Sequence, residues 1–388
     1  MRIAIIINNM HSGGAERVAL TLLNTLIDMG HIVTFVLFKE EGPLLSDIPK
    51  NTGIVALNDE PTLMAALNPF SGLRKWLKRI KKTDEFDVLL TSSSKINNIT
   101  VLANKIAKTN IPIVITEHNI FSEFIADRHI HRRIYHLSMA KLLYKKADLY
   151  VAVSDYVRKD AIKLGLISAD KAHYIHNPIM FREDLQEGLH HWFEDCSLEV
   201  VLSVGSFFGV KDYPTLVKAF ALLHKKRPQT RLIILGRGGK RVLIEGLVKE
   251  LQIQDYVDMP GFLNPYNFMK YSKVYVCSSK HEASSLAVGE ALMAGLNVVS
   301  TDCGGPAELL GFGEYGQLVP VGDHEALAAA VEDAIINPIS SDVLKDRASN
   351  WEPKLILSKY IELINEMLQN RNSATYKSRI EERIYVKK

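Results

Sequence analysis

The feature that most constrains the fold is an alternation of short apolar runs with longer amphipathic segments, repeated in both halves of the 388-residue chain. The apolar runs have the length of buried strands, and the segments between them are long enough for helices. This order predicts parallel βαβ units, in which helices cover both faces of a sheet. The predicted strands are Ile3–Ile7, Ile32–Phe38, Val88–Leu90, Ile113–Ile115, Leu149–Val153, Val200–Val204, Leu232–Leu235, Val274–Cys277, Val298–Thr301 and Leu318–Val319.

The length of the chain predicts two domains, because a domain holds about 150 residues. We place the boundary after Pro178, where an acidic, aromatic stretch without a clear period runs to about Ser197 and is interpreted as a linker. The sequence therefore predicts an α/β protein of two Rossmann-like, doubly wound domains, residues 1–178 and 179–370, facing each other across a cleft. Residues 371–388 form a polar, basic tail in this prediction.

Composition excludes several classes of protein. The three cysteines, Cys196, Cys277 and Cys303, lack the spacing of a metal site or a disulfide framework, so we expect small buried residues in a reducing compartment. The first apolar run is too short for a signal peptide, and no window approaches the roughly 18 apolar residues of a membrane-spanning helix. We therefore expect a cytoplasmic protein.

Charge is distributed unevenly between the two halves. Residues 1–178 carry 23 Lys and Arg against 17 Asp and Glu, whereas residues 179–388 carry 24 against 27. The basic first half predicts an anionic partner on that side. The low net charge of +3 and the lack of a recognised binding module argue against nucleic acid.

One segment, Ser278–Pro306, concentrates residues suited to a polar ligand. Glu282 lies in a loop after a predicted strand, and Glu290 lies in a helix that we expect to end at Gly295. The carboxyl ends of neighbouring parallel strands meet where open α/β sheets bind ligands. Ionised carboxylates accept two hydroxyl donors at once, which suits a sugar.

This segment, with the sequence EASSLAVGEALMAGLNVVSTDCGGPAELL from Glu282 onward, resembles the donor-binding signature of the retaining glycosyltransferases of family 4. That family has the two-domain GT-B fold, and the resemblance runs from about Ile3 to Leu368. It also implies that the last helices, near Trp351–Leu368, cross back onto the N-terminal domain. It implies that Glu290 binds the ribose hydroxyls of a nucleotide sugar and that Glu282 lies beside the sugar. Two glutamates without these surroundings would be interpreted as a solvated surface.

A glycine pair after the first predicted strand matches the family's GGAE loop. Gly13 and Gly14 let the backbone approach a ligand, and the helix start that follows attracts an anion. Alone, this pattern fits a tight turn without a ligand equally well. The resemblance implies that the loop lies against the donor diphosphate and the acceptor, with Glu16 and Arg17 on the acceptor side.

A second motif of the first half, TEHN at residues 116–119, follows a predicted strand. A lone histidine in this position is usually structural, but the family has a histidine here, close to the transferred sugar. We expect His118 to position the sugar, because a neutral imidazole donates from one nitrogen and accepts at the other. Asn119 and Ser154 are expected on the acceptor side.

The diphosphate clamp departs from the family pattern, which has a Gly-Arg pair and then a Lys five residues past the Arg. Lys211 matches the Lys, but Ser206 stands at the Arg position and offers one neutral hydrogen bond in place of a forked, charged contact. Either another cation compensates or the leaving group is stabilised less. We expect compensation, and the nearest candidates are Arg237, Lys240 and Arg241.

Other donor contacts are expected in nearby loops. Gly236 and Arg237 match the family's LGxG segment beside the nucleotide, and Phe262 belongs to the short turn Pro260–Phe262, which matches a turn whose backbone contacts the base; ordinary strand-to-helix turns are the plainer alternative. Ala283 replaces a common glycine, so we expect a slightly different loop path. The backbone amides expected to face the phosphates and sugar are those of Ser284, Ser285 and Leu286.

Residues 73–82 predict a helix with one apolar stripe and six cations on its remaining face. Packing on the first sheet explains the stripe; the alternative is an interfacial helix on anionic lipid, and both hold if only the basic face meets lipid. The stripe consists of Leu73, Trp76, Leu77 and Ile80. A second cationic patch consists of Arg132, Arg133, Lys141, Lys145 and Lys146.

Together these features predict a retaining hexosyltransferase in which Glu282, His118 and Lys211 are catalytic. The resemblance implies transfer of a hexose or N-acetylhexosamine from a nucleotide sugar, which we predict to be UDP-linked, to a polyprenyl-diphosphate-linked saccharide. It also implies that no metal or other cofactor is needed, and we expect peripheral association with the inner face of the cell membrane. Two alternatives remain: a nucleotide-sugar epimerase on the same fold, and a catalytically weak scaffold that binds nucleotide or is the partner of another transferase.

Overall fold

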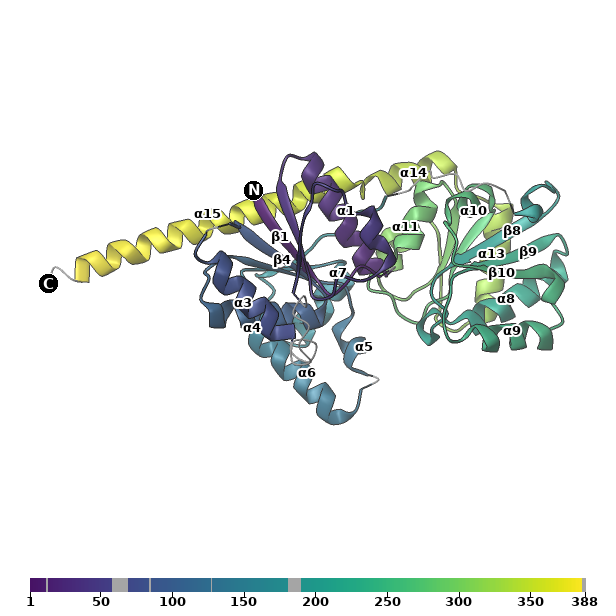
Figure 1. Ribbon diagram of the computed structural model, residues 1–388. Helices are drawn as coiled ribbons and strands as arrows, with labels where there is room; N and C mark the ends of the chain where they lie inside the picture. The colour runs from purple at the N-terminus through teal and green to yellow at the C-terminus, as the bar shows by residue number, and fades with distance from the viewer. Residues whose placement is uncertain (12, 58–68, 84, 127, 181–189, 386–388) are drawn as a thin grey trace. The chain divides into compact units, whose positions relative to one another are not determined.

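A computed structural model describes residues 1–11, 13–57, 69–83, 85–126, 128–180 and 190–385 (Figure 1). The chain forms two compact units, one of Met1–Pro178 with Pro353–Lys388 and the other of Ile179–Glu352. Each unit is built on one parallel sheet, so the predicted α/β architecture of two Rossmann-like domains is confirmed.

The first unit contains a seven-stranded sheet in the order β3-β2-β1-β4-β5-β6-β7, and all neighbouring strands are parallel. The order reverses between β1 and β4, where loops leave the sheet in opposite directions and open a ligand position. The strands are β1 (Arg2–Ile7), β2 (Ile32–Leu37), β3 (Gly53–Ala56), β4 (Val88–Ser92), β5 (Ile113–Glu117), β6 (Leu149–Ala152) and β7 (Ala172–Tyr174).

Helices cover the first sheet because their apolar stripes need burial. Helix α4 packs against both α3 and α6, and α15 packs against α1 (Figure 1). The helices are α1 (Gly14–Asp28), α3 (Pro69–Ile80), α4 (Ser94–Ala107), α5 (Phe121–Ala126), α6 (Ile130–Leu143), α7 (Asp155–Lys163) and α15 (Pro353–Tyr385), with 3₁₀ turns at Pro43–Asp47 and Tyr144–Lys146.

The second unit contains a six-stranded parallel sheet in the order β10-β9-β8-β11-β12-β13, which reverses between β8 and β11. Its strands are β8 (Glu199–Val204), β9 (Thr230–Leu235), β10 (Val257–Gly261), β11 (Val274–Cys277), β12 (Asn297–Thr301) and β13 (Gln317–Val319). Its helices are α8 (Tyr213–Lys226), α9 (Arg241–Glu250), α10 (Tyr266–Tyr271), α11 (Leu286–Met293), α12 (Gly305–Leu309), α13 (His324–Ile336) and α14 (Ser341–Ser349). Its 3₁₀ turns are His191–Phe193, Gly209–Lys211, Gln254–Tyr256 and Gly311–Gly313.

The division after Pro178 lies where we placed it. Helix α15 packs on the first unit, in agreement with the crossing of the last helices that the resemblance implies, so the second unit ends at Glu352 and not at residue 370. The same helix continues to Tyr385, so most of the predicted tail is helical.

The predicted linker is also partly incorrect. His190 contacts Asp258 of β10 through its Nε2 atom at 2.8 Å, and the Phe193 ring packs on Phe268 with centroids 5.9 Å apart. Residues 190–197 therefore belong to the second unit, while residues 181–189 of that prediction lie outside the described residues.

The chain passes between the units at two points, after Pro178 and after Glu352. The Ile179 amide donates to the Trp351 carbonyl at 2.9 Å, and both side chains are buried. The two ends of the second unit are therefore tied to each other.

The apolar stripe of α3 is buried, as packing on the sheet requires: Leu73, Trp76, Leu77 and Ile80 are at most 5% exposed. The residues of this helix that are described as exposed, Arg74, Lys75, Lys78 and Arg79, are all cations. Among the helices of the described residues, none combines the length and the apolar character needed to cross a bilayer.

Candidate functional site

The second unit places the predicted donor-binding loops at its switch point. The loops after β8 and β11 leave neighbouring strands on the two sides of the reversal in strand order. The Ser278 hydroxyl donates to the Lys211 carbonyl at 2.8 Å, and the Lys280 amide donates to the Val210 carbonyl at 2.8 Å. These bonds fix one loop against the other. As a result Lys211 and Glu282, which are 71 positions apart in sequence, face each other.

The side chains of Lys211 and Glu282 form an ion pair at this point. The side chains are 23% and 13% exposed, and Ser279 donates a second hydrogen bond to the same carboxylate oxygen at 2.8 Å. Burial disfavours the charged ammonium, but the Glu282 carboxylate outweighs it and raises the pKa of Lys211 above its usual value. Lys211 is therefore a fixed cation beside a fixed carboxylate, as a diphosphate next to a sugar requires.

Glu290 lies inside α11 and is 3% exposed, as its predicted place in a helix requires. The helix begins at the Ser285 cap, whose hydroxyl accepts from the Val288 amide at 3.4 Å. It ends where we predicted: Gly295 has φ of +72°, and the Leu296 amide donates to the Ala291 carbonyl at 2.9 Å. Ser285 thus has a capping role, with a side chain 5% exposed.

The loop between Glu282 and α11 accommodates Ala283 without a left-handed backbone, since Ala283 is not among the non-glycine residues of positive φ in the described chain. The Glu282 amide donates to the Cys303 carbonyl at 2.8 Å, and the Gly305 amide donates to the Glu282 carbonyl at 2.8 Å. The loop is thereby bonded to the glycine turn after β12. Ser284 and Leu286 lie half-buried between these anchors and the helix start.

The three candidate replacements for the missing arginine lie in different environments. Arg241 donates to Glu245 at 2.7 Å and to the Met259 carbonyl at 2.9 Å, so it is held on α9 and β10. The Arg237 guanidinium lies 5.0 Å from the centroid of the Phe262 ring, which is 59% exposed. This contact places the Arg237 guanidinium over the ring of Phe262, the aromatic residue that we predicted beside the base.

Lys240 is the candidate that reaches the clamp loop. A Cβ built on Gly209 would lie 2.9 Å from Lys240 Nζ, so the ammonium lies against the loop that holds Ser206 and Lys211. The Lys240 amide also donates to the Phe207 carbonyl at 3.1 Å. Within the described part of the chain, no carboxylate forms an ion pair with Lys240, which leaves its charge available to an anion.

In the first unit, His118 follows β5 at the carboxyl edge of the sheet, as predicted. The Thr116 hydroxyl donates its one proton to the Thr91 carbonyl at 2.8 Å, so it accepts from His118 Nε2 at 3.0 Å. This assignment leaves Nδ1 as an acceptor for a substrate hydroxyl. Burial lowers the pKa of His118 to about 4, so the ring is neutral near pH 7.

Glu117 was not among the predicted site residues, but it anchors the turn that carries His118. Its carboxyl group is fully buried and accepts from Tyr144 at 2.6 Å and from Ser94 at 2.9 Å. It also accepts from the amide nitrogen of Asn119 at 3.2 Å, and burial raises the pKa of Glu117. The sequence signal that could have identified Glu117 is an acidic residue at the end of a buried strand.

At the start of α1, Glu16 folds back over Gly13. A Cβ on Gly13 would lie 2.3 Å from Glu16 Oε2, so only glycine permits this contact. Burial raises the pKa of Glu16, and a diphosphate at this helix start would compete with the carboxylate for the same position. Gly14 begins the helix and Arg17 is exposed beside it.

Ser154 was predicted on the acceptor side, and the structure gives it another role. Its hydroxyl accepts from the Val157 amide at 3.2 Å and caps α7. The residue is fully buried, so capping explains it without an acceptor.

Two cysteines border the donor-binding loops. Cys277 and Cys303 are each 4% exposed free thiols, as predicted for small buried residues, whereas Cys196 is exposed. A hydrogen bond from Cys303 lowers the pKa of Cys277 to about 7.

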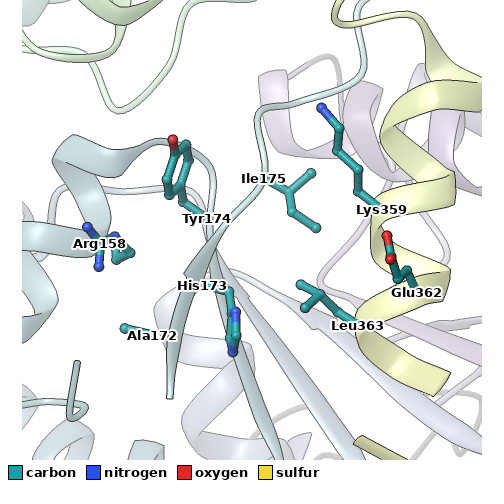
Figure 2. A pocket seen from close by; sticks show the side chains of 8 residues that line it. All are labelled: Arg158, Ala172, His173, Tyr174, Ile175, Lys359, Glu362 and Leu363. Atoms are coloured by element: carbon teal, nitrogen blue, oxygen red, sulfur yellow. The ribbon is translucent and has the colours of Figure 1, made fainter. Parts of the chain in front are cut away.

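A cavity of about 390 Å³ lies in the first unit between β7 and α15. Figure 2 shows Tyr174 on one side and Lys359 and Glu362 of α15 on the other. None of the predicted site residues lines it, and Arg158 at its edge pairs with Asp155.

Solved structures share this two-unit architecture. The chain matches HepE of Anabaena in complex with UDP and glucose at a TM-score of 0.76 and 20% identity, covering 94% of this chain and all of that one. The protein therefore has the fold of a GT-B glycosyltransferase. Family models match both units: Glycosyltransferase Family 4 over residues 12–181 and Glycosyl transferases group 1 over residues 193–351. The chain therefore belongs to the glycosyltransferases that these two models describe.

Two relatives are similar over nearly their whole length. One is the N-acetylgalactosamine-N,N'-diacetylbacillosaminyl-diphospho-undecaprenol 4-alpha-N-acetylgalactosaminyltransferase of Campylobacter jejuni, 28% identical over 90% of this chain and 96% of that protein. The other is an uncharacterized glycosyltransferase of Haemophilus influenzae, 25% identical over 92% and 96% of the two chains.

Proposed function

We propose that this glycosyltransferase moves a hexose or N-acetylhexosamine from a UDP-sugar to a hydroxyl of a polyprenyl-diphosphate-linked saccharide, with retention of configuration. The Lys211–Glu282 pair at the switch point carries the proposal, because it offers a cation for a diphosphate beside a carboxylate for sugar hydroxyls. The name of the Campylobacter relative supports the acceptor class, and the HepE complexes support a UDP donor.

In this proposal the acceptor hydroxyl attacks the anomeric carbon from the leaving-group side while the bond to the diphosphate breaks. The departing diphosphate oxygen takes the hydroxyl proton. Lys211 and Lys240 stabilise the charge that develops on that oxygen, and this leaves no step that requires a divalent metal. Lys240 thus takes the role of the family's arginine, whose position in this chain is occupied by Ser206.

Other residues orient the donor. Glu290 accepts hydrogen bonds from the ribose, and the exposed ring of Phe262 with the Arg237 guanidinium lies on the side of the base. His118 accepts a substrate hydroxyl at Nδ1, for which its neutral state is suited. Because the relative acts on an undecaprenyl-linked substrate, we also propose that the enzyme works at the inner face of the cell membrane.

Calorimetric titration with UDP, GDP and ADP in the presence of a chelator tests the donor site. Selective binding of UDP that is lost in Glu290→Ala, but kept in the exposed control Glu250→Ala, is expected. Equal failure of all three nucleotides with folded protein would contradict the proposal and would favour a non-enzymatic scaffold that binds a partner transferase.

A second experiment distinguishes sugar transfer from epimerisation of the UDP-sugar. Incubation with UDP-sugars and an undecaprenyl-diphosphate-linked saccharide should extend the acceptor, and nuclear magnetic resonance of the product should show the donor's anomeric configuration. Conversion of the UDP-sugar without any acceptor would instead identify an epimerase.

A further inference from the structure

Two of the chain's three cysteines meet beside the donor-binding loops. Cys277 is the last residue of β11, and Cys303 lies in the turn after β12. The two thiols are hydrogen-bonded to each other, and each side chain is 4% exposed. A single buried cysteine packs like a small apolar residue, but two thiols in contact can also be joined by oxidation.

This thiol pair, Cys277 and Cys303, is connected to the Lys211–Glu282 ion pair through the side chain of Ser279. The Ser279 hydroxyl donates its one proton to Glu282 Oε1 at 2.8 Å, so it accepts from Cys277 Sγ at 3.6 Å. Lys211 binds the same carboxylate oxygen. A chain of polar contacts therefore runs from the thiol pair to the ion pair that carries the proposed function.

The backbone provides a second connection between the thiol pair and Glu282. The Glu282 amide donates to the Cys303 carbonyl at 2.8 Å, and the Gly305 amide donates to the Glu282 carbonyl at 2.8 Å. Sulfur atoms in hydrogen-bond contact lie farther apart than the about 2.05 Å of a disulfide. Formation of the disulfide must therefore draw the turn after β12 toward the end of β11, and Glu282 is bonded to that turn.

The surroundings of Cys277 favour its reactive form. The hydrogen bond from Cys303 stabilises the Cys277 thiolate and, against the effect of burial, lowers the pKa of Cys277 to about 7. The Lys211 ammonium acts in the same direction. The thiolate is the form that attacks an oxidant, so Cys277 is suited to attack and Cys303 to resolve the product.

We propose that Cys277 and Cys303 form a reversible oxidation site that takes hydrogen peroxide, and that their disulfide weakens donor binding. The Cys277 sulfur attacks one peroxide oxygen, the O–O bond breaks, and the hydroxide that leaves takes up the proton lost by the Cys277 thiol. The Cys303 sulfur then attacks the resulting sulfenic acid, and its oxygen leaves as a second water with the Cys303 proton. The two thiols lose two electrons and two protons, and the peroxide is reduced to two waters.

Peptide mapping by mass spectrometry of the full chain, before and after treatment with hydrogen peroxide, tests the oxidation site. A linked peptide that joins Cys277 to Cys303 is expected after treatment, and dithiothreitol should remove it. In calorimetric titration the oxidised chain should bind UDP at least ~10-fold more weakly, because Lys211 loses the carboxylate that fixes it as a cation for the diphosphate. Dithiothreitol should restore this affinity.

The third cysteine provides a matched control. Cys196 is exposed, so Cys196→Ser removes the most accessible thiol and should still form the disulfide and lose UDP affinity. Cys277→Ser removes the attacking sulfur, and its Kd for UDP should stay within about twofold on peroxide treatment. Circular dichroism shows whether this variant is folded, and Cys303→Ser gives the same comparison if it is not.

Absence of the linked peptide, a link that involves Cys196, or a disulfide that leaves Kd for UDP unchanged would overturn the proposal. An equal loss of affinity in peroxide-treated Cys277→Ser would also overturn it, in favour of oxidation elsewhere in the chain. The effect on binding rests on the proposed function, so a reduced chain that binds no nucleotide would contradict both. The linked peptide is measured without nucleotide and decides the oxidation site separately.

Discussion

Lys240→Ala tests whether a lysine from the loop after β9 replaces the arginine that the family has at position 206. In the structure the Lys240 ammonium lies against Gly209, and it has no carboxylate partner among the described residues. A charge-assisted hydrogen bond to a phosphate contributes about 1.5–3 kcal/mol to binding. Lys240 is exposed, so the lower end of this range applies, and Kd for UDP should rise about tenfold.

The assay is calorimetric titration of UDP, together with the transfer rate at saturating donor. Because Lys240 is proposed to stabilise charge on the leaving group, kcat should also fall in Lys240→Ala, with a smaller loss in Lys240→Arg. Adding Ser206→Arg to Lys240→Ala should restore much of the binding, since it returns the forked cation to the family position.

Arg241→Ala is the matched control, because this neighbouring cation is held by Glu245 and by the Met259 carbonyl. It should leave Kd for UDP within about twofold of the wild type, which is a change of about 0.4 kcal/mol. Equal losses in Lys240→Ala and Arg241→Ala would show a general effect of positive charge. A Kd in Lys240→Ala that matches the wild type would refute the assignment outright.

Three other outcomes follow from the described contacts. Gly238→Ala should lower the free energy of unfolding by about 2 kcal/mol or more in urea titrations, because its Cβ would lie 2.8 Å from the backbone of buried Phe207. His118 has a pKa of about 4 in the folded chain and about 6.5 when unfolded, so stability should fall by up to about 3 kcal/mol as the pH decreases between these values. His118→Asn should flatten that part of the curve of stability against pH, and an unchanged slope would contradict a ring that is neutral in the folded chain. Glu117→Ala should cost about 3 kcal/mol, since the Tyr144 hydroxyl loses its acceptor, and Glu117→Gln should cost less in the same titration.

The sequence predicted the central strands of both sheets and one edge strand, β13, and missed β3, β7 and β10. All three missed strands are edge strands in the sheet order. Such strands are half-solvated, so they need no continuous apolar run, and β10 even contains Pro260, which an edge tolerates. A continuous run of apolar residues identifies a strand that is buried on both faces. This signal is weakest for an edge strand, one side of which meets water.

The candidate site divides in a similar way. Glu282, Glu290 and Lys211 could be predicted because their surroundings are encoded within short segments, and the structure brings Glu282 to Lys211. Lys240 could only be named among three cations, since the choice depends on which side chain reaches Gly209 across two loops. Contacts between distant loops are set by tertiary packing, which a local pattern does not contain.

The bond between Ile179 and Trp351 has a consequence for how this architecture can change. The second unit is an insertion whose two ends are adjacent, while both chain termini belong to the first unit. A segment of this kind can be exchanged as one cassette through two neighbouring joins, without rerouting the rest of the chain. Recombination could therefore join the same first unit to a different second unit, with the joins near residues 178 and 353.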